Sequence, residues 1–317
     1  MVLRRRAELV ATSRADELSL HALADVAEIT ADQKVRIIGG QMTSLLLIAF
    51  PVPGVPARRT RDADTAITTE LAGSGVLHHR LVARGYTATA GNSYSKAVPE
   101  LAVPGALVPE LSVDLLVPSL DGRFRPSEYG GRAFDSAPGL APALAADPIT
   151  IETAATMLDG TVLEFVVRVP TVELAVVIKA HAYASRKEDR DVEDIYRLLE
   201  IANTYPAEEI GGWQLDQNSL RASRRDAAAH LHELARRSRS RTSADVPQAR
   251  LAALIAARTA RPAERREGLQ PTSQDTCVHR FVMRAKRADI AAITAARGSP
   301  SRYAELRENC VVQLEPE

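Results

Sequence analysis

The segment KVRIIGGQMTSLLLIAF, residues 34–50, joins a short apolar run, a glycine pair and a second apolar run. The pattern predicts a strand over 34–38, a turn at Gly39-Gly40 and a helix over 41–50. Glycines at such a junction let the backbone approach a ligand closely, and the free N–H groups that open the helix favour a phosphate. Hydroxyls one turn into the helix, at Thr43 and Ser44, add possible hydrogen bonds. Neither a P-loop nor a GxGxxG dinucleotide fingerprint is present.

A proline-rich stretch, 51–59, follows and is expected to be a loop. Residues 62–67 (DADTAI) then alternate polar and apolar side chains, which predicts a half-buried strand. Because side chains repeat every second residue in a strand, Asp62 and Asp64 point to one face. Two neighbouring carboxylates repel each other unless a cation lies between them, and such oxygen ligands suit Mg²⁺. A solvated strand edge is the alternative interpretation.

A third acid, Asp114, interrupts the apolar run LSVDLLVP (111–118) that we expect to form another strand. A buried carboxylate is costly unless it is paired or bound to a metal. A satisfied structural aspartate would also fit this position. Three carboxylates from two strands can hold two metal ions about 4 Å apart, the arrangement that drives phosphoryl displacement.

Lys179 lies in an otherwise apolar helical segment, AVVIKAHAYA. We expect it to reach the surface or to meet an anion. Arg186 and Lys187 follow it, and then Asp191 and Asp194. The alternative for Asp191 is a helix N-cap.

The remaining pattern is α/β up to about residue 170 and helical afterwards. Strands are expected at 111–118 and 161–170, and a hairpin and loop at 120–148. The predicted helices cover residues 16–29, 70–85, 174–186, 192–203, 219–237, 247–260 and 288–297, with linker composition at 260–274. We therefore divide the chain into 1–203, 204–262 and a segment of unknown role at 263–317.

Composition places few limits on function. Forty basic residues balance forty acidic ones, so net charge gives no argument for nucleic acid or membrane binding. No apolar run approaches the roughly 20 residues that cross a bilayer, and the N-terminus has no apolar signal region. Cys277 and Cys310 cannot form a disulfide framework, so we expect a cytoplasmic protein. No histidine shows metal-ligand spacing, so we expect the histidines, His181 included, at the surface or in packing.

Taken together, the glycine pair, the segment 58–64 (RRTRDAD) and the strand of Asp114 resemble the polymerase-β-type nucleotidyltransferase signature. The segment 179–199, KAHAYASRKEDRDVEDIYRLL, is similar to the AbiEii-type branch, the toxin halves of abortive-infection and toxin–antitoxin pairs. The resemblance covers about 35–200. It departs from the family where Gln41-Met42 intervene before Thr43, and where the distance from Gly40 to Asp62 is long.

The resemblance implies a small mixed sheet flanked by helices, followed by a C-terminal helical region. It implies Mg²⁺-dependent transfer of a nucleoside monophosphate from an NTP to a hydroxyl. Two Mg²⁺ ions would be held by Asp62, Asp64 and Asp114, with Asp114 helping to deprotonate the acceptor and Lys179 pairing with the triphosphate. The residues expected to bind the nucleotide are Gly39, Gly40, Thr43, Ser44, Arg59, Thr60, Arg186 and Lys187.

The resemblance also implies an acceptor and a partner. The acceptor would be RNA, notably the tRNA 3′ end, and the partner a cognate antitoxin protein. Arginine clusters beyond residue 220 could follow a phosphate backbone, although solvated arginine-rich helices look the same. A small-molecule acceptor of the aminoglycoside type and a non-catalytic nucleotide-binding or partner-binding protein remain open alternatives.

Overall fold

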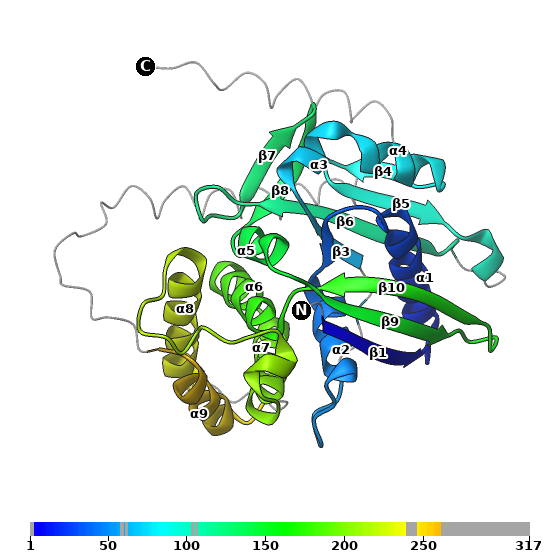
Figure 1. Ribbon diagram of the computed structural model, residues 1–317. Coiled ribbons are helices and arrows are strands. Elements are labelled where there is room, and N and C mark those ends of the chain that lie inside the picture. The colour runs from blue at the N-terminus through cyan, green and yellow to red at the C-terminus, as the bar shows by residue number, and fades with distance from the viewer. Residues whose placement is uncertain are drawn as a thin grey trace, which may run out of the picture. The chain divides into compact units, whose positions relative to one another are not determined.

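The protein is described from a computed structural model (Figure 1) that covers residues 3–57, 60, 63–102, 105, 107–238 and 246–260. Contacts divide the chain into two compact units, Met1–Pro262 and Ala263–Glu317. All described residues belong to the first unit. The expected linker at 260–274 lies outside the described residues except for Ala260, and the expected helix at 288–297 lies outside them entirely.

The larger of two sheets carries the two acidic strands. It has the order β2-β3-β6-β5-β4, with β8 added beside β6 and β7 beside β8. β3 and β6 are parallel neighbours in its centre. The described strands of this sheet are Val35–Ile37 (β2), Ala63–Ile67 (β3), Thr87–Ala90 (β4), Ser93–Ala97 (β5), Glu110–Pro118 (β6), Arg125–Tyr129 (β7) and Arg132–Ala137 (β8).

A second sheet of three strands has the order β1-β9-β10. Its strands are Leu3–Val10 (β1), Ile149–Thr156 (β9) and Val162–Val169 (β10). The sequence predicted β10 but neither β1 nor β9. In β1 the side chains facing the core include Arg5 between small or apolar residues, so the apolar alternation is weak. The sequence of β1 therefore shows a run of basic residues and no clear strand pattern.

Helices surround the sheets and confirm the mixed α/β class with a helical C-terminal part. α1 packs on β6 and β10, and α6 contacts α7 and α8. Figure 1 shows α6, α7, α8 and α9 gathered on one side of the two sheets. The described α-helices are Arg14–Ile29 (α1), Gly39–Ala49 (α2), Thr69–Ser74 (α3), Val76–Ala83 (α4), Leu140–Ala145 (α5), Val172–Arg186 (α6), Asp189–Thr204 (α7), Ala222–Ser238 (α8) and Gln248–Arg258 (α9).

Two expectations were wrong in detail. The single helix expected over 70–85 is two helices, because Gly75 adopts φ +71°, a left-handed conformation that ends α3 and begins α4. The 120–148 stretch does contain a hairpin, β7–β8, but it also contains the short helix α5. The helical region at 204–262 belongs to the same compact unit as the sheets.

Within the described residues, every helix is too short or too polar to cross a membrane.

Candidate active site

Asp64 and Asp114 lie directly opposite each other on the parallel strands β3 and β6. Side chains at paired positions point to the same face, and neighbouring strands are about 4.8 Å apart. On the other side of β6, Ser93 of β5 pairs with Asp114 in the same row. Both aspartates are half-buried. The structure thus places two of the three predicted carboxylates side by side.

The backbone of Gly39 lies in close contact with Asp64. The Ile38 amide donates to the Asp64 carbonyl oxygen at 2.9 Å, which carries the pairing of β2 with β3 to the point where α2 begins. Gly39 has φ +68°, and a Cβ built there would lie 2.0 Å from Asp64 Oδ2 and 3.0 Å from its Cβ. Only glycine fits this close approach, so the turn and the carboxylate form one unit.

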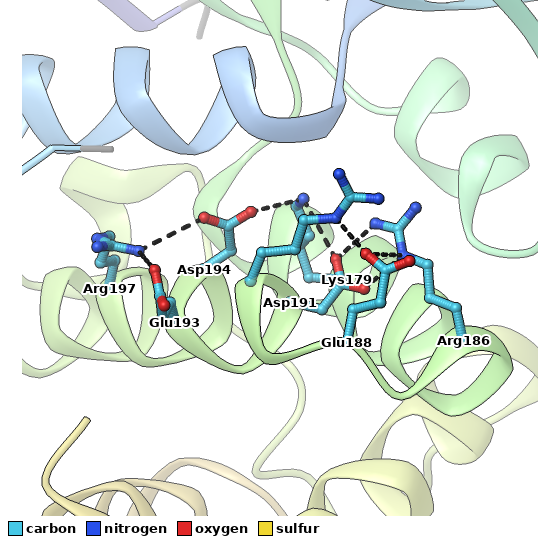
Figure 2. Close-up of polar contacts among 8 residues, drawn as sticks. Lys179, Arg186, Glu188, Asp191, Glu193, Asp194 and Arg197 are labelled. Carbon is cyan, nitrogen blue, oxygen red and sulfur yellow. Dashed lines mark hydrogen bonds and ion pairs between the residues drawn. The ribbon is translucent and has the colours of Figure 1, made fainter. Parts of the chain in front are cut away.

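Lys179 lies in a buried ion-pair network between α6 and α7 (Figure 2). Its Nζ is 2.7 Å from Asp194 and 3.6 Å from Asp191, and only 3% of the residue is exposed. Both aspartates are fully buried. The anion expected for this lysine is therefore present within the protein, and contact with a triphosphate would require these pairs to open.

Arg186 lies at one end of the network. Its Nε and Nη2 donate to the two carboxylate oxygens of Asp191, both at 2.6 Å. The Asp191 hydrogen bond and charge raise the pKa of Arg186 above its ordinary value, and Glu188 and Asp64 add smaller electrostatic contributions. The side chain of Arg186 is about 38% exposed, so this end of the network is open to solvent.

At its other end, the network holds the loop that precedes β3. Arg197 lies 3.7 Å from Asp194 and donates from Nε to the Pro56 carbonyl oxygen at 3.0 Å. Tyr205 donates to the Pro51 carbonyl oxygen at 2.9 Å. α7 therefore fixes the course of the expected proline loop.

The other predicted nucleotide-binding residues are spread around α2. Gly40 and Thr43 are buried, and the Thr43 hydroxyl has no hydrogen-bond partner within the described residues. Ser44 and Thr60 line a cavity on a different side of the helix. Lys187 ends α6 in a left-handed conformation, φ 56°, with Nζ 4.8 Å from the centre of the Tyr183 ring. Arg59 and Asp62 lie outside the described residues.

Two alternatives from the sequence are decided by these positions. Asp191 is not the N-cap of α7, because Glu188 holds that position and Asp191 lies inside the first turn. His181 is a packing residue. It is 5% exposed, its Nε2 lies 3.1 Å from the Ser223 carbonyl oxygen, and burial lowers its pKa.

The donor set suits a hard divalent cation. Two carboxylates in register, next to a backbone turn that admits no side chain, offer the oxygen ligands that Mg²⁺ prefers. Within the described residues no group of three or more His, Cys, Asp or Glu side chains could hold a metal, and Asp62 is not among those residues. The described part therefore supplies two of the three acids predicted for the site.

Sequence reasoning did not foresee three features of this region. Asp191 and Asp194 act as the partners of Lys179, although their spacing after it was visible. Ser93 joins the carboxylate row through strand pairing, which the sequence does not show. Gln41 lines the cavity beside Ser44.

Comparison with known proteins gives likenesses in structure but none in sequence. No protein-family model matches the sequence, and no curated protein matches it. The chain is similar in structure to an antigenic nucleotidyltransferase-like protein from Paracoccidioides brasiliensis, at 16% identity and a TM-score of 0.41, over 78% of this chain and 95% of that one.

Replacing Gly39 by alanine should destabilise the protein more than the same change at Gly54. Both glycines have positive φ, +68° and +77°, so both changes carry a backbone strain of about 1 kcal/mol. At Gly39 the new Cβ also collides with Asp64. At Gly54 the new Cβ meets no atom within 4 Å. We expect Gly39→Ala to lower the free energy of unfolding by about 1 kcal/mol more than Gly54→Ala, measured in urea. Equal losses would show that the Gly39–Asp64 contact is absent.

Replacing Lys179 by methionine should leave Asp191 and Asp194 buried without their lysine. Removing one partner of a buried ion pair costs about 3–5 kcal/mol, and Arg186 and Arg197 will offset part of that cost. We expect the free energy of unfolding to fall by about 3 kcal/mol. The matched control is Lys34→Met, since Lys34 is exposed and should change stability by less than about 0.5 kcal/mol. A Lys179 variant as stable as this control would contradict the network.

Proposed function

We propose that the protein transfers a nucleoside monophosphate from an NTP to a hydroxyl acceptor. The observation that carries this proposal is the in-register pair Asp64 and Asp114, backed by the Gly39 turn. Two carboxylates held side by side are the arrangement expected where divalent ions join protein carboxylates to a polyphosphate.

In this proposal the acceptor oxygen forms a bond to the α-phosphorus while the bond to the β-phosphate oxygen breaks. Pyrophosphate leaves with the electron pair, and the acceptor proton passes to a carboxylate oxygen of Asp114. Arg186 would pair with the leaving phosphates, and Asp64 would help to hold the metal. Mg²⁺ bound by the acids would neutralise the charge that develops on the phosphoryl oxygens. The protein would hold the acceptor hydroxyl and the α-phosphate in the orientation that the reaction needs.

Lys179 takes a positioning role in this proposal. Its ion pairs with Asp191 and Asp194 join α6 to α7, and Asp191 in turn holds Arg186. The network thereby holds the Arg186 guanidinium in place while Lys179 itself stays buried. A direct contact between Lys179 and a phosphate stays a prediction from the resemblance.

RNA remains the acceptor implied by the resemblance, with a toxin role and an antitoxin partner as further predictions. The described arginines of α8 do not add support, because each is paired with an acid of the protein. Arg224 binds Glu173, Arg225 binds Asp226, and Arg236 and Arg237 bind Glu233. Since the proposed donor is an NTP, we expect the cytoplasm as the place of action.

One observation favours a small, uncharged or cationic acceptor instead. The sheet face that carries Asp64 and Asp114 also carries Ser93, Ser112 and Asp135. Ser93 is paired with Asp114, Ser112 lies two residues before Asp114 on β6, and Asp135 is paired with Leu116, two residues after Asp114. Arg36 of β2, which pairs with Ala66, also lies on this face, and its guanidinium donates to the Leu144 and Ala146 carbonyl oxygens. Carboxylates and hydroxyls of this kind suit an acceptor that carries amines and hydroxyls.

Asp64→Asn and Asp114→Asn should each lower the rate of NTP-dependent pyrophosphate release by at least about 100-fold. Both variants should stay folded, because removing one of two adjacent carboxylates relieves repulsion. The assay mixes protein, Mg²⁺ and each NTP with total RNA or with aminoglycosides, and mass spectrometry identifies the product. Asp159→Asn is the matched control, as Asp159 is an exposed acid between β9 and β10 of the other sheet.

Release that depends on RNA supports the first acceptor, and release that depends on the drug supports the second. Nucleotide binding with no release under either condition supports a non-catalytic protein. Near-normal transfer by the Asp64 or Asp114 variant would overturn the assignment of these residues.

A further inference from the structure

A row of hydroxyl side chains lies next to the carboxylate pair on the larger sheet. Ser95 of β5 pairs with Ser112 of β6 on one side and with Thr87 of β4 on the other. Ser112 is two residues before Asp114 on β6, so these two side chains point to the same face of the sheet. We call Thr87, Ser95 and Ser112 the hydroxyl row.

Ser93 links the hydroxyl row to the carboxylate pair. It is paired with Asp114 across β5 and β6, and it is two residues before Ser95 on its own strand. Neighbouring strands are about 4.8 Å apart, and positions two residues apart along a strand are about 7 Å apart. Together with Asp114, the three serines therefore mark the corners of a rectangle of about 5 by 7 Å. A single sugar ring with its hydroxyl groups covers such an area.

The three serine hydroxyls are available to a ligand. Ser93, Ser95 and Ser112 are half-buried, and Thr87 at the outer end of the hydroxyl row is exposed. In the part of the chain that the structure describes, none of the three serine hydroxyls makes a hydrogen bond to another residue. Because a hydroxyl both donates and accepts, these positions suit a ligand that itself carries several hydroxyls.

The carboxylate pair lies between the hydroxyl row and the glycine turn. Gly39 contacts Asp64 from the β2 side of β3, where α2 begins. The hydroxyl row extends in the other direction, from β6 to β5 and β4. Since a helix N-terminus favours phosphate, the nucleotide phosphates and the acceptor would approach the acids from opposite sides.

We propose that Ser93, Ser95 and Ser112 bind the acceptor, and that the acceptor hydroxyl belongs to a sugar ring. The proposal rests on the proposed nucleotidyl transfer. A sugar presents several neighbouring hydroxyls, so it can meet the serines while one further hydroxyl lies at Asp114. A serine or tyrosine of a protein acceptor brings a single hydroxyl and would leave the row unused. The terminal ribose of an RNA and an amino sugar share the chemistry that this subsite recognises.

The reacting oxygen is then a ring hydroxyl held beside Asp114. It forms the bond to the α-phosphorus, pyrophosphate leaves with the electron pair of the broken bond, and Asp114 takes the hydroxyl proton. The serines touch the other hydroxyls of the ring and fix its orientation, which is the contribution expected of a binding subsite.

The first test measures pyrophosphate release by the full-length protein with Mg²⁺, each NTP and one of four acceptor probes. The probes are tRNA, the same tRNA after periodate has opened its terminal ribose, kanamycin, and casein as a protein rich in hydroxyl side chains. We expect release with tRNA or with kanamycin and none with casein. Loss of release after periodate identifies the terminal ribose as the source of the sugar, and release with kanamycin identifies an amino sugar.

The second test uses Ser95→Ala and Ser112→Ala with the probe that supports release. Each variant should raise the KM for that acceptor about fivefold, the value of one neutral hydrogen bond. The kcat should change less than about twofold, because these contacts are made equally before and during the reaction. The affinity for the NTP, measured by calorimetry without acceptor, should stay within about twofold, since the phosphates lie on the other side of the acids.

Ser127→Ala is the matched control. Ser127 is a half-buried serine of β7 in the same sheet, and it pairs with Phe134, so it points to the opposite face from Asp135 and the hydroxyl row. This variant should leave the KM for the acceptor unchanged.

The outcomes separate the subsite from the proposed function. Release with casein alone, an unchanged KM in both serine variants, or an equal rise in the Ser127 variant would overturn the sugar subsite while leaving nucleotide transfer intact. No release with any NTP and any probe would overturn the proposed function and the subsite with it.

Discussion

Two negatively charged side chains lie side by side on adjacent parallel strands, and the structure around them depends on this pair. Asp64 and Asp114 face each other because β3 and β6 pair in parallel register. The β2 strand extends that pairing until Gly39 contacts Asp64, where no residue with a Cβ fits. The N-terminus of α2 brings a partial positive charge beside Asp64, and Asp64 in turn contributes to the raised pKa of Arg186.

A line of alternating charges keeps that positive charge in place. It runs from Arg186 through Asp191, Lys179 and Asp194 to Arg197, and each contact joins α6, α7 or the loop before β3. Lys179, Asp191 and Asp194 are almost fully buried. Separating any of these charges would leave an unpaired charge in the interior, so the network resists movement of α6 relative to α7. The network thus connects the loop before β3 to α6 and α7. The ion pair of Glu173 on α6 with Arg224 on α8 connects α8 to the same group of helices.

Sequence patterns predicted the elements where apolar periodicity is strong and failed where it is weak. β6 and α7 were foreseen nearly to their ends, while β1 was hidden by the inward-facing Arg5 and the break at Gly75 was read as helix interior. The proximity of Asp64 to Asp114 was a hypothesis from residue type, since strand register depends on contacts that one sequence does not display. The partners of Lys179 were visible as acids, but only packing shows that they enclose it.

The most direct test is anomalous X-ray diffraction from crystals of the full-length protein soaked with Mn²⁺ and a non-hydrolysable NTP analogue. The account predicts an anomalous peak bridging the carboxylates of Asp64 and Asp114, with oxygen ligands at about 2.1 Å and the triphosphate on its Arg186 side. Manganese bound elsewhere, with both carboxylates remote from any metal and from the analogue, would contradict it.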